Sequence, residues 1–150
     1  MTHVPLNARI GHEMPGSASI QPDEGNLVAG AQIYRDQCAA CHGYYGKPSP
    51  FAAHMYPRAP QLWEKHRNRD AIGVSDDAPG ETYWKVANGI RLTGMPAYKE
   101  ILSQTQIWQV SLLLAGANKP LPPAALQIVR GGQAAATPPA APAVPAAKSK

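Results

Sequence analysis

Several features that commonly identify a protein's class are scarce or missing in this 150-residue chain. Charged residues make up only 16% of it, and its net charge of +4 is too small to indicate a nucleic-acid-binding protein. No run of ~18 consecutive apolar residues is present, so the sequence predicts no membrane-spanning helix. The N-terminus also lacks the basic start and apolar run of a secretory signal peptide.

Familiar catalytic arrangements are missing as well. The sequence has no paired carboxylates suited to acid–base work, no Ser-His-Asp order and no glycine-rich loop that would hold a phosphate. It has only two cysteines, which are too few for a structural zinc site built on several thiolates. The chemistry of the chain must therefore be sought around those two cysteines.

Composition divides the chain into three parts. Residues 1–23 mix Pro, Gly, Ser and Asn without periodicity, and we expect a flexible segment there. Residues 131–150 contain eight Ala and four Pro, and we expect residues 121–150 to form a largely disordered Pro/Ala-rich tail. Residues 24–120 remain as one compact domain. A core of this size commonly depends on a metal, a disulfide or a cofactor.

Three segments of that domain have the spacing of apolar residues that predicts helices, over about 26–38, 79–88 and 104–115. Asp23 suits the start of the first helix, Asp77 is a candidate cap for the second, and Ser103 can form a capping box at the third. No alternating strand pattern is present. The sequence therefore predicts an all-α fold with three or more helices and irregular loops.

Residues 38–42 form a Cys-x-x-Cys-His pattern at the end of the first predicted helix. Two thiols three positions apart at a helix end face the same way, so Cys38 and Cys41 can both bond to one haem while His42 ligates its iron. A thioredoxin-like pair would need a strand–helix–strand pattern, which is missing. The pattern predicts one covalent haem c, against which the proline-rich, aperiodic segment 43–76 would pack.

A second iron ligand is expected from the Thr-Gly-Met-Pro sequence at residues 93–96. The thioether of Met95 is a soft ligand that favours ferrous iron and raises the reduction potential. Most methionines only fill core gaps, but the upstream attachment motif makes Met95 the preferred candidate. His54, His66 and Met55 are rivals from the long irregular segment, and each is more readily explained as a surface or packing residue.

Over residues 27–117 the chain resembles the class I cytochromes c. Gly30 and Tyr34 precede Cys38 by eight and four positions, as the small and aromatic residues of the family's N-terminal helix do, and Trp108 is the matching aromatic on the last helix. The resemblance implies that these two helices cross closely at Gly30 with aromatics interlocking there. The stretch 88–98 is similar to the distal loop of small periplasmic, often membrane-tethered, monohaem cytochromes.

Two further residues are expected at the cofactor. Residues 59–62 look like the family's Pro-x-Leu segment, which implies that the Pro60 carbonyl accepts a hydrogen bond from His42. Arg91 lies four positions before Met95 and is a candidate to meet a haem propionate, with a solvated surface charge as the alternative. Arg58 and Trp63 are weaker candidates for the same contact. The predicted cofactor-binding residues are thus Cys38, Cys41, His42, Pro60, Arg91 and Met95, of which His42 and Met95 ligate the metal.

The sequence therefore predicts a single-electron carrier rather than an enzyme, with the haem iron cycling between Fe(III) and Fe(II) in a bacterial respiratory or dehydrogenase chain. Expected partners are redox proteins, namely a donor dehydrogenase or oxidoreductase and an acceptor oxidase or reductase, held transiently or by a tether. No nucleic acid is expected. The alternatives are a haem peroxidase, which needs a displaceable sixth ligand, and a gas or redox sensor, which needs an output module.

The resemblance also implies a periplasmic location, soluble or membrane-tethered, because haem is attached to such proteins after export. We therefore expect that a signal sequence or an N-terminal anchor is missing before Met1. The stretch from Lys47 to Arg69 has a local charge of +4 and is a candidate docking face for an acidic partner. A merely solvated loop is the simpler interpretation of those charges.

Overall fold

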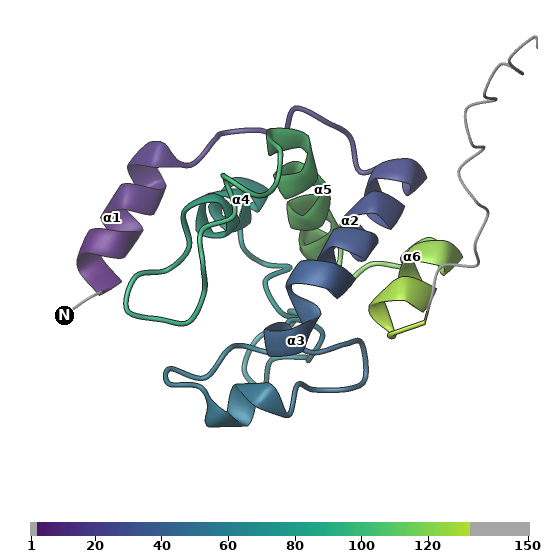
Figure 1. The fold of residues 1–150 in the computed structure, drawn as a ribbon. Helices are drawn as coiled ribbons and strands as arrows, with labels where there is room; N and C mark the ends of the chain where they lie inside the picture. The colour runs from purple at the N-terminus through teal and green to yellow at the C-terminus, as the bar shows by residue number, and fades with distance from the viewer. Residues whose placement is uncertain (1–2, 133–150) are drawn as a thin grey trace, which may run out of the picture.

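The computed structural model describes residues 3–132, and within that range it contains helices and loops but no strands (Figure 1). The elements in chain order are α1 (His3–Glu13), α2 (Glu24–Gln37), α3 (Ala39–His42), the 3₁₀ helix η1 (Phe51–His54), α4 (Pro79–Asn88), α5 (Gln104–Ala115) and α6 (Pro123–Val129). The all-α prediction is confirmed. None of the described helices is long and apolar enough to cross a membrane.

The three predicted helices correspond to α2, α4 and α5. The capping box predicted at Ser103 is complete, and Asp23, expected at the start of the first helix, is the N-cap of α2, because its carboxylate accepts from the Asn26 N–H. The cap expected from Asp77 is wrong, because α4 begins after Ala78 without a side-chain cap. The Asp77 carboxylate instead pairs with Lys85 at 3.4 Å.

The core is centred on the crossing of α2 and α5 (Figure 1). At Gly30 the two helices approach so closely that a Cβ atom would lie 2.3 Å from the carbonyl oxygen of Gln109. Only glycine permits that approach, as the resemblance implied. Ala31 on α2 and Val110 on α5 are completely buried beside the crossing, so the close contact replaces solvent with apolar packing.

The aromatic residues near this crossing pair differently from the expected interlock. Tyr34 of α2 meets Trp63 edge-on, with ring centroids 5.5 Å apart, whereas Trp108 of α5 lies against Tyr83 of α4 at 4.4 Å. Tyr34 therefore fastens α2 to the segment that follows the attachment motif. Trp108 fastens α5 to α4, so the two aromatics join different parts of the fold.

The expectation of a disordered tail from residue 121 is wrong for its first part. Residues 123–129 form α6, which packs against α2, with Ala125, Ile128 and Val129 completely buried. The three apolar residues share one helical face, and the alanine- and proline-rich composition around them hid that short pattern from the sequence analysis. The compact domain therefore extends beyond residue 120. Residues 133–150 lie outside the described range.

The expectation of a flexible N-terminal segment also needs correction, because residues 3–13 form α1. This helix packs against α4, where it buries Ile10 and where the Glu13 carboxylate accepts a hydrogen bond from the Trp84 indole at 2.9 Å. The carbonyl of Pro15 approaches Gly80 too closely for any larger residue there. These contacts are long-range, which explains why local composition gave no indication of the helix.

Candidate cofactor site

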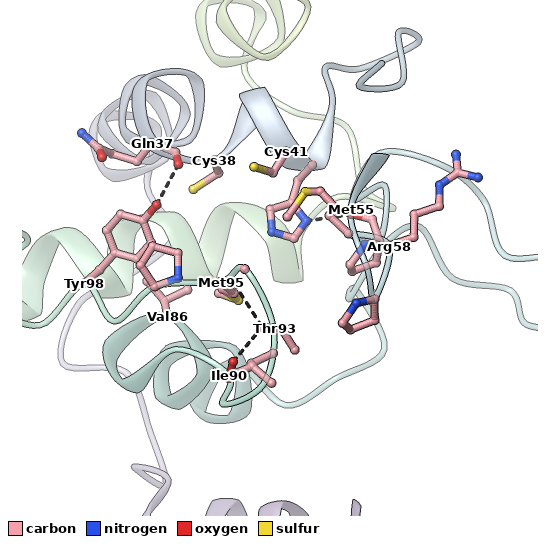
Figure 2. A pocket seen from close by; sticks show the side chains of 16 residues that line it. Gln37, Cys38, Cys41, Met55, Arg58, Val86, Ile90, Thr93, Met95 and Tyr98 are labelled. Atoms are coloured by element: carbon pink, nitrogen blue, oxygen red, sulfur yellow. Dashed lines mark hydrogen bonds between the residues drawn. The ribbon is translucent and has the colours of Figure 1, made fainter. Parts of the chain in front are cut away.

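An apolar pocket lies between the α2–α3 junction and the loop that follows α4 (Figure 2). Its cavity volume is about 170 Å³, and its lining is mostly apolar. Its walls come from residues 37–42, 55–60 and 90–98 together with Val86 of α4. The lining includes five of the six predicted cofactor-binding residues: Cys38, Cys41, His42, Pro60 and Met95.

Residues 38–43, here called the attachment turn, bring both thiols to one wall. Cys38 joins α2 to α3, and its carbonyl accepts from the N–H groups of Cys41 and His42 at 3.1 and 2.9 Å. Figure 2 shows the two sulfur atoms entering the pocket from the same side. Burial, with a smaller contribution from Cys41, raises the pKa of the Cys38 thiol to about 12. The thiol is therefore neutral and is poorly suited to act as a catalytic nucleophile.

The imidazole of His42 is oriented by the backbone of Pro60. Its Nδ1 lies 2.7 Å from the Pro60 carbonyl oxygen, the contact that the family resemblance implied. Because a carbonyl can only accept, Nδ1 carries the proton and the lone pair resides on Nε2. Burial lowers the pKa of His42, and the bond to Pro60 opposes that shift only in part. The side chain is thus a neutral imidazole with one nitrogen prepared to bind a metal.

Gln61 fastens the Pro60 segment to the attachment turn, and the sequence analysis missed it. We call residues 59–62 the proline strap. The Gln61 amide donates to the Cys41 carbonyl at 3.1 Å, and its Oε1 accepts from the Ser49 N–H at 2.7 Å. Gly43 has φ of 77°, and a Cβ there would lie 2.5 Å from the same Oε1. A glycine directly after the motif and a glutamine inside the strap were the available signals.

Residues 90–98, here called the methionine loop, form another wall. The Thr93 hydroxyl donates to the Ile90 carbonyl at 2.7 Å and accepts from the Met95 N–H at 3.1 Å, as Figure 2 shows. Gly89 has φ of 67°, and a Cβ there would lie 2.8 Å from the Met95 carbonyl oxygen. The loop can therefore fold back on the end of α4, which places the half-buried Met95 side chain in the pocket lining.

The far end of the methionine loop is tied to α2. The Tyr98 hydroxyl donates to the Gln37 carbonyl at 2.9 Å, and its N–H donates to the Val86 carbonyl at 3.0 Å. Burial raises the pKa of Tyr98, so its hydroxyl keeps the proton that makes this bond. The loop is thus anchored to the residue that precedes Cys38.

This geometry agrees with the comparison to known families. Residues 25–114 match the family model described as cytochrome c oxidase, cbb3-type, subunit III. The chain belongs to this family of class I c-type cytochrome domains. The match covers the attachment turn, the proline strap and the methionine loop, whereas α1 and α6 lie outside it. Membership of the family implies a haem cofactor and haem-based electron transfer.

A solved structure with a TM-score above 0.5 shares this fold at low sequence identity. A chain of the Kuenenia stuttgartiensis reducing HAO-like protein complex superposes with a TM-score of 0.54 and 20% identity, over 65% of this chain and 46% of that one. The cytochrome domain thus corresponds to about half the length of that protein. Cytochrome cL of Methylophaga aminisulfidivorans gives a TM-score of 0.45 and 15% identity, over 61% of this chain and 53% of that one. No curated protein sequence matches the chain.

Not every residue predicted to contact the cofactor lines the pocket of the cytochrome domain. Arg91 is exposed and is not among the lining residues, so its contact with a propionate stays a prediction. Arg58, the weaker candidate, does line the pocket, and Figure 2 shows its guanidinium pointing outward. Trp63 is buried against Tyr34 and is not part of the lining.

Of the three rival ligands, one lines the pocket and two do not. His66 Nε2 lies 2.6 Å from the Gly73 carbonyl oxygen, so this nitrogen is already engaged away from the pocket. His54 is exposed on η1 and is not among the lining residues. Met55 does line the pocket, so the cytochrome domain presents two methionine side chains to the same space.

Proposed function

We propose that this domain is a single-electron carrier that binds one haem c through Cys38 and Cys41, with His42 and Met95 as axial ligands. The observation that carries the proposal is the meeting of four side chains in one pocket: two thiols and an imidazole from the attachment turn, and a thioether from the methionine loop (Figure 2). When bound, the haem supplies a one-electron couple between ferric and ferrous iron.

The residues present fit that cofactor in their chemistry. Both cysteines are free and line the pocket, so their side chains are available to bond to the vinyl groups of a haem, and His42 is a neutral imidazole whose Nδ1 is already bonded. A thioether from Met95 favours the reduced metal. The apolar lining limits water around the site, and ligands that stay the same in both oxidation states would keep the rearrangement on electron gain small.

The alternative of a haem peroxidase is less well supported by the pocket. Such an enzyme needs a polar group near the sixth position that can move a proton. The polar side chains of the methionine loop that line the pocket are Thr93 and Tyr98, and both hydroxyl groups already donate to backbone carbonyls. Neither hydroxyl is arranged to act as an acid or base. Electron transfer without catalysis is therefore the better proposal.

The wider role follows from the same chemistry. A carrier of single electrons needs a donor and an acceptor, so we propose redox-protein partners, a dehydrogenase or oxidoreductase on one side and an oxidase or reductase on the other. We also propose a periplasmic location, because covalent haem attachment to this family follows export. With such partners, the domain would work in a respiratory or dehydrogenase electron-transfer chain of a bacterium.

Two measurements on the protein produced with periplasmic haem maturation test the proposal. Denaturing mass spectrometry should show one haem added to the polypeptide, and the ferric protein should show the near-infrared charge-transfer band of methionine-to-iron ligation. A normal polypeptide mass would exclude covalent attachment. A high-spin ferric spectrum with haem attached would exclude ligation by Met95 and favour the peroxidase.

A further inference from the structure

The second methionine in the pocket is not explained by ligation alone. Met55 follows η1 and is half-buried, and it lines the pocket together with Met95. Figure 2 shows Met55 on the side of Arg58, away from the turn formed by Ile90 and Thr93. The two thioethers thus reach the same space from segments that are far apart in the sequence.

Met55 touches the methionine loop at the residue next to the proposed ligand. Its terminal methyl carbon Cε packs so closely on Gly94 that a Cβ atom added there would lie 2.8 Å from it. Methionine is unbranched and flexible, which suits it to fill an irregular gap of this kind. Gly94 has no left-handed φ, and Met55 Cε is the atom that a Cβ added at Gly94 would meet.

Near this point the methionine loop forms no hydrogen bond with another segment among the described residues, and its other outside support is the packing of the Met95 side chain on the core. For residues 91–97 the hydrogen bonds in the described structure stay within the loop, between Ile90, Thr93 and Met95. Leu92 adopts a left-handed conformation with φ of 63° and is 80% exposed. Such a conformation is strained for a residue other than glycine and persists only where the surroundings hold it. Packing of Met55 on Gly94 is a contact that joins the loop to another segment.

We propose that Met55 is a positioning residue that holds Gly94, and through it Met95, against the pocket without ligating the metal. The proposal rests on the proposed ligation by His42 and Met95. Loss of the Met55 side chain lets the loop withdraw more often. An external ligand that must displace Met95 then binds more tightly, because its apparent affinity depends on the fraction of molecules with the position open.

Imidazole titration of the ferric holoprotein measures that fraction directly. In Met55→Ala we expect imidazole to bind about tenfold more tightly, equivalent to ~1.4 kcal/mol, while the near-infrared band persists without imidazole. Gly94→Ala should tighten binding by a smaller factor, about threefold, because the added Cβ pushes on the flexible end of Met55. Met14→Ala, at a methionine that is 36% exposed and outside the pocket, is the matched control and should bind imidazole as the wild type does.

The double variant Met55→Ala/Gly94→Ala identifies the contact itself. If Met55 acts through Gly94, the second substitution adds nothing to the first, because the methyl group it would strike is gone. Independent, additive effects would overturn the proposed contact. Wild-type imidazole affinity in Met55→Ala would overturn positioning while leaving ligation by Met95 intact.

Other outcomes separate this inference from the proposed function. Loss of the near-infrared band in Met55→Ala together with its retention in Met95→Ala would make Met55 the ligand and would end both proposals. Should Met55→Ala fail to accumulate as holoprotein, Gly94→Ala carries the test, since an unchanged imidazole affinity in that variant would overturn positioning.

Discussion

The attachment turn is fastened to several distant segments, whereas the methionine loop is held largely by bonds within itself. The backbone of the attachment turn accepts hydrogen bonds from Tyr34, Gln61, Leu62 and Ser49, and His42 is bonded to Pro60. The methionine loop depends on Thr93, on the anchor at Tyr98 and on the close approach at Gly89. The attachment turn, which would bear the covalent bonds to the haem, is therefore the rigid wall of the pocket. The methionine loop, which would supply the replaceable ligand, is the looser wall.

The largest effect is expected where the rigid wall meets the cofactor. Cys38→Ala combined with Cys41→Ala should abolish covalent haem attachment and most of the cooperative fold, because cofactor binding free energy becomes folding free energy in a small domain. Denaturing mass spectrometry measures the attachment, and far-ultraviolet circular dichroism measures the helix content. Haem that remains covalently attached in this variant would contradict the assigned role of the two thiols.

On the looser wall the expected effect is spectroscopic rather than structural. Met95→Ala should retain covalent haem and the fold, because the attachment turn does not depend on this loop. It should lose the near-infrared band, lower the reduction potential and gain weak peroxidase-like activity through the open sixth position. A potentiometric titration followed by absorbance measures these changes. An unchanged low-spin spectrum would show that Met55 or His54 is the ligand instead.

A third prediction concerns α6, which supports the rigid wall from behind. The Val129 carbonyl accepts from the Tyr45 N–H at 2.8 Å, just beyond the attachment turn, and Ile128 is completely buried. Ile128→Ala should lower the free energy of unfolding by ~2–5 kcal/mol, because it removes buried methyl groups and leaves a cavity. Denaturant unfolding of the holoprotein measures this loss.

The exposed neighbour Gln127 provides the matched control for α6. Gln127→Ala should change the free energy of unfolding by no more than ~0.5 kcal/mol. Equal, small effects of the two substitutions would mean that α6 is not part of the cooperative domain, as the composition of the tail first indicated. A loss confined to Ile128→Ala would place the domain boundary after residue 129.

How far the sequence could predict this molecule depends on the range of the contacts involved. The helices α2, α4 and α5 and the Ser103 capping box follow from local spacing, and the Cys-x-x-Cys-His pattern is local as well. The helices α1 and α6 depend on partners far along the chain, such as Trp84 for Glu13. Local sequence patterns do not indicate which distant residues a segment will contact, so these two helices could not be predicted.

The same distinction applies to the pocket. The contact between Pro60 and His42 could be predicted only from the family resemblance. The residues around Pro60 do not indicate which histidine its carbonyl meets. Gln61 and Met55 act through contacts with Cys41 and Gly94, 20 and 39 positions away. Arg91 was favoured for its spacing from Met95, yet Arg58 from the long irregular segment reaches the lining. Spacing predicts neighbours within one element and fails where two loops meet.

The smallest effect is expected at the charged surface formed by the long irregular segment. The basic stretch from Lys47 to Arg69 is less uniform than its sequence indicates, because Lys65 pairs with Asp70 at 3.1 Å and Arg69 pairs with Asp76. Among the described residues, Lys47, Arg58 and Arg67 form no ion pair of this kind. Paired charges largely cancel at a distance, so the unpaired cations contribute most to the field that an approaching molecule meets within a Debye length of ~10 Å at 0.1 M salt.

Oxidation of the ferrous holoprotein by anionic ferricyanide can measure that field. Lys47→Gln with Arg67→Gln should lower the second-order rate constant at low salt and flatten its dependence on ionic strength, since exposed charges act mainly on encounter. The control Lys65→Gln with Asp70→Asn removes a pair without changing the net charge, so its rate should follow the wild type. Both variants should keep the spectrum and the potential. If the two variants behave alike, molecules approach the cofactor from another face, and the basic stretch is only a solvated loop.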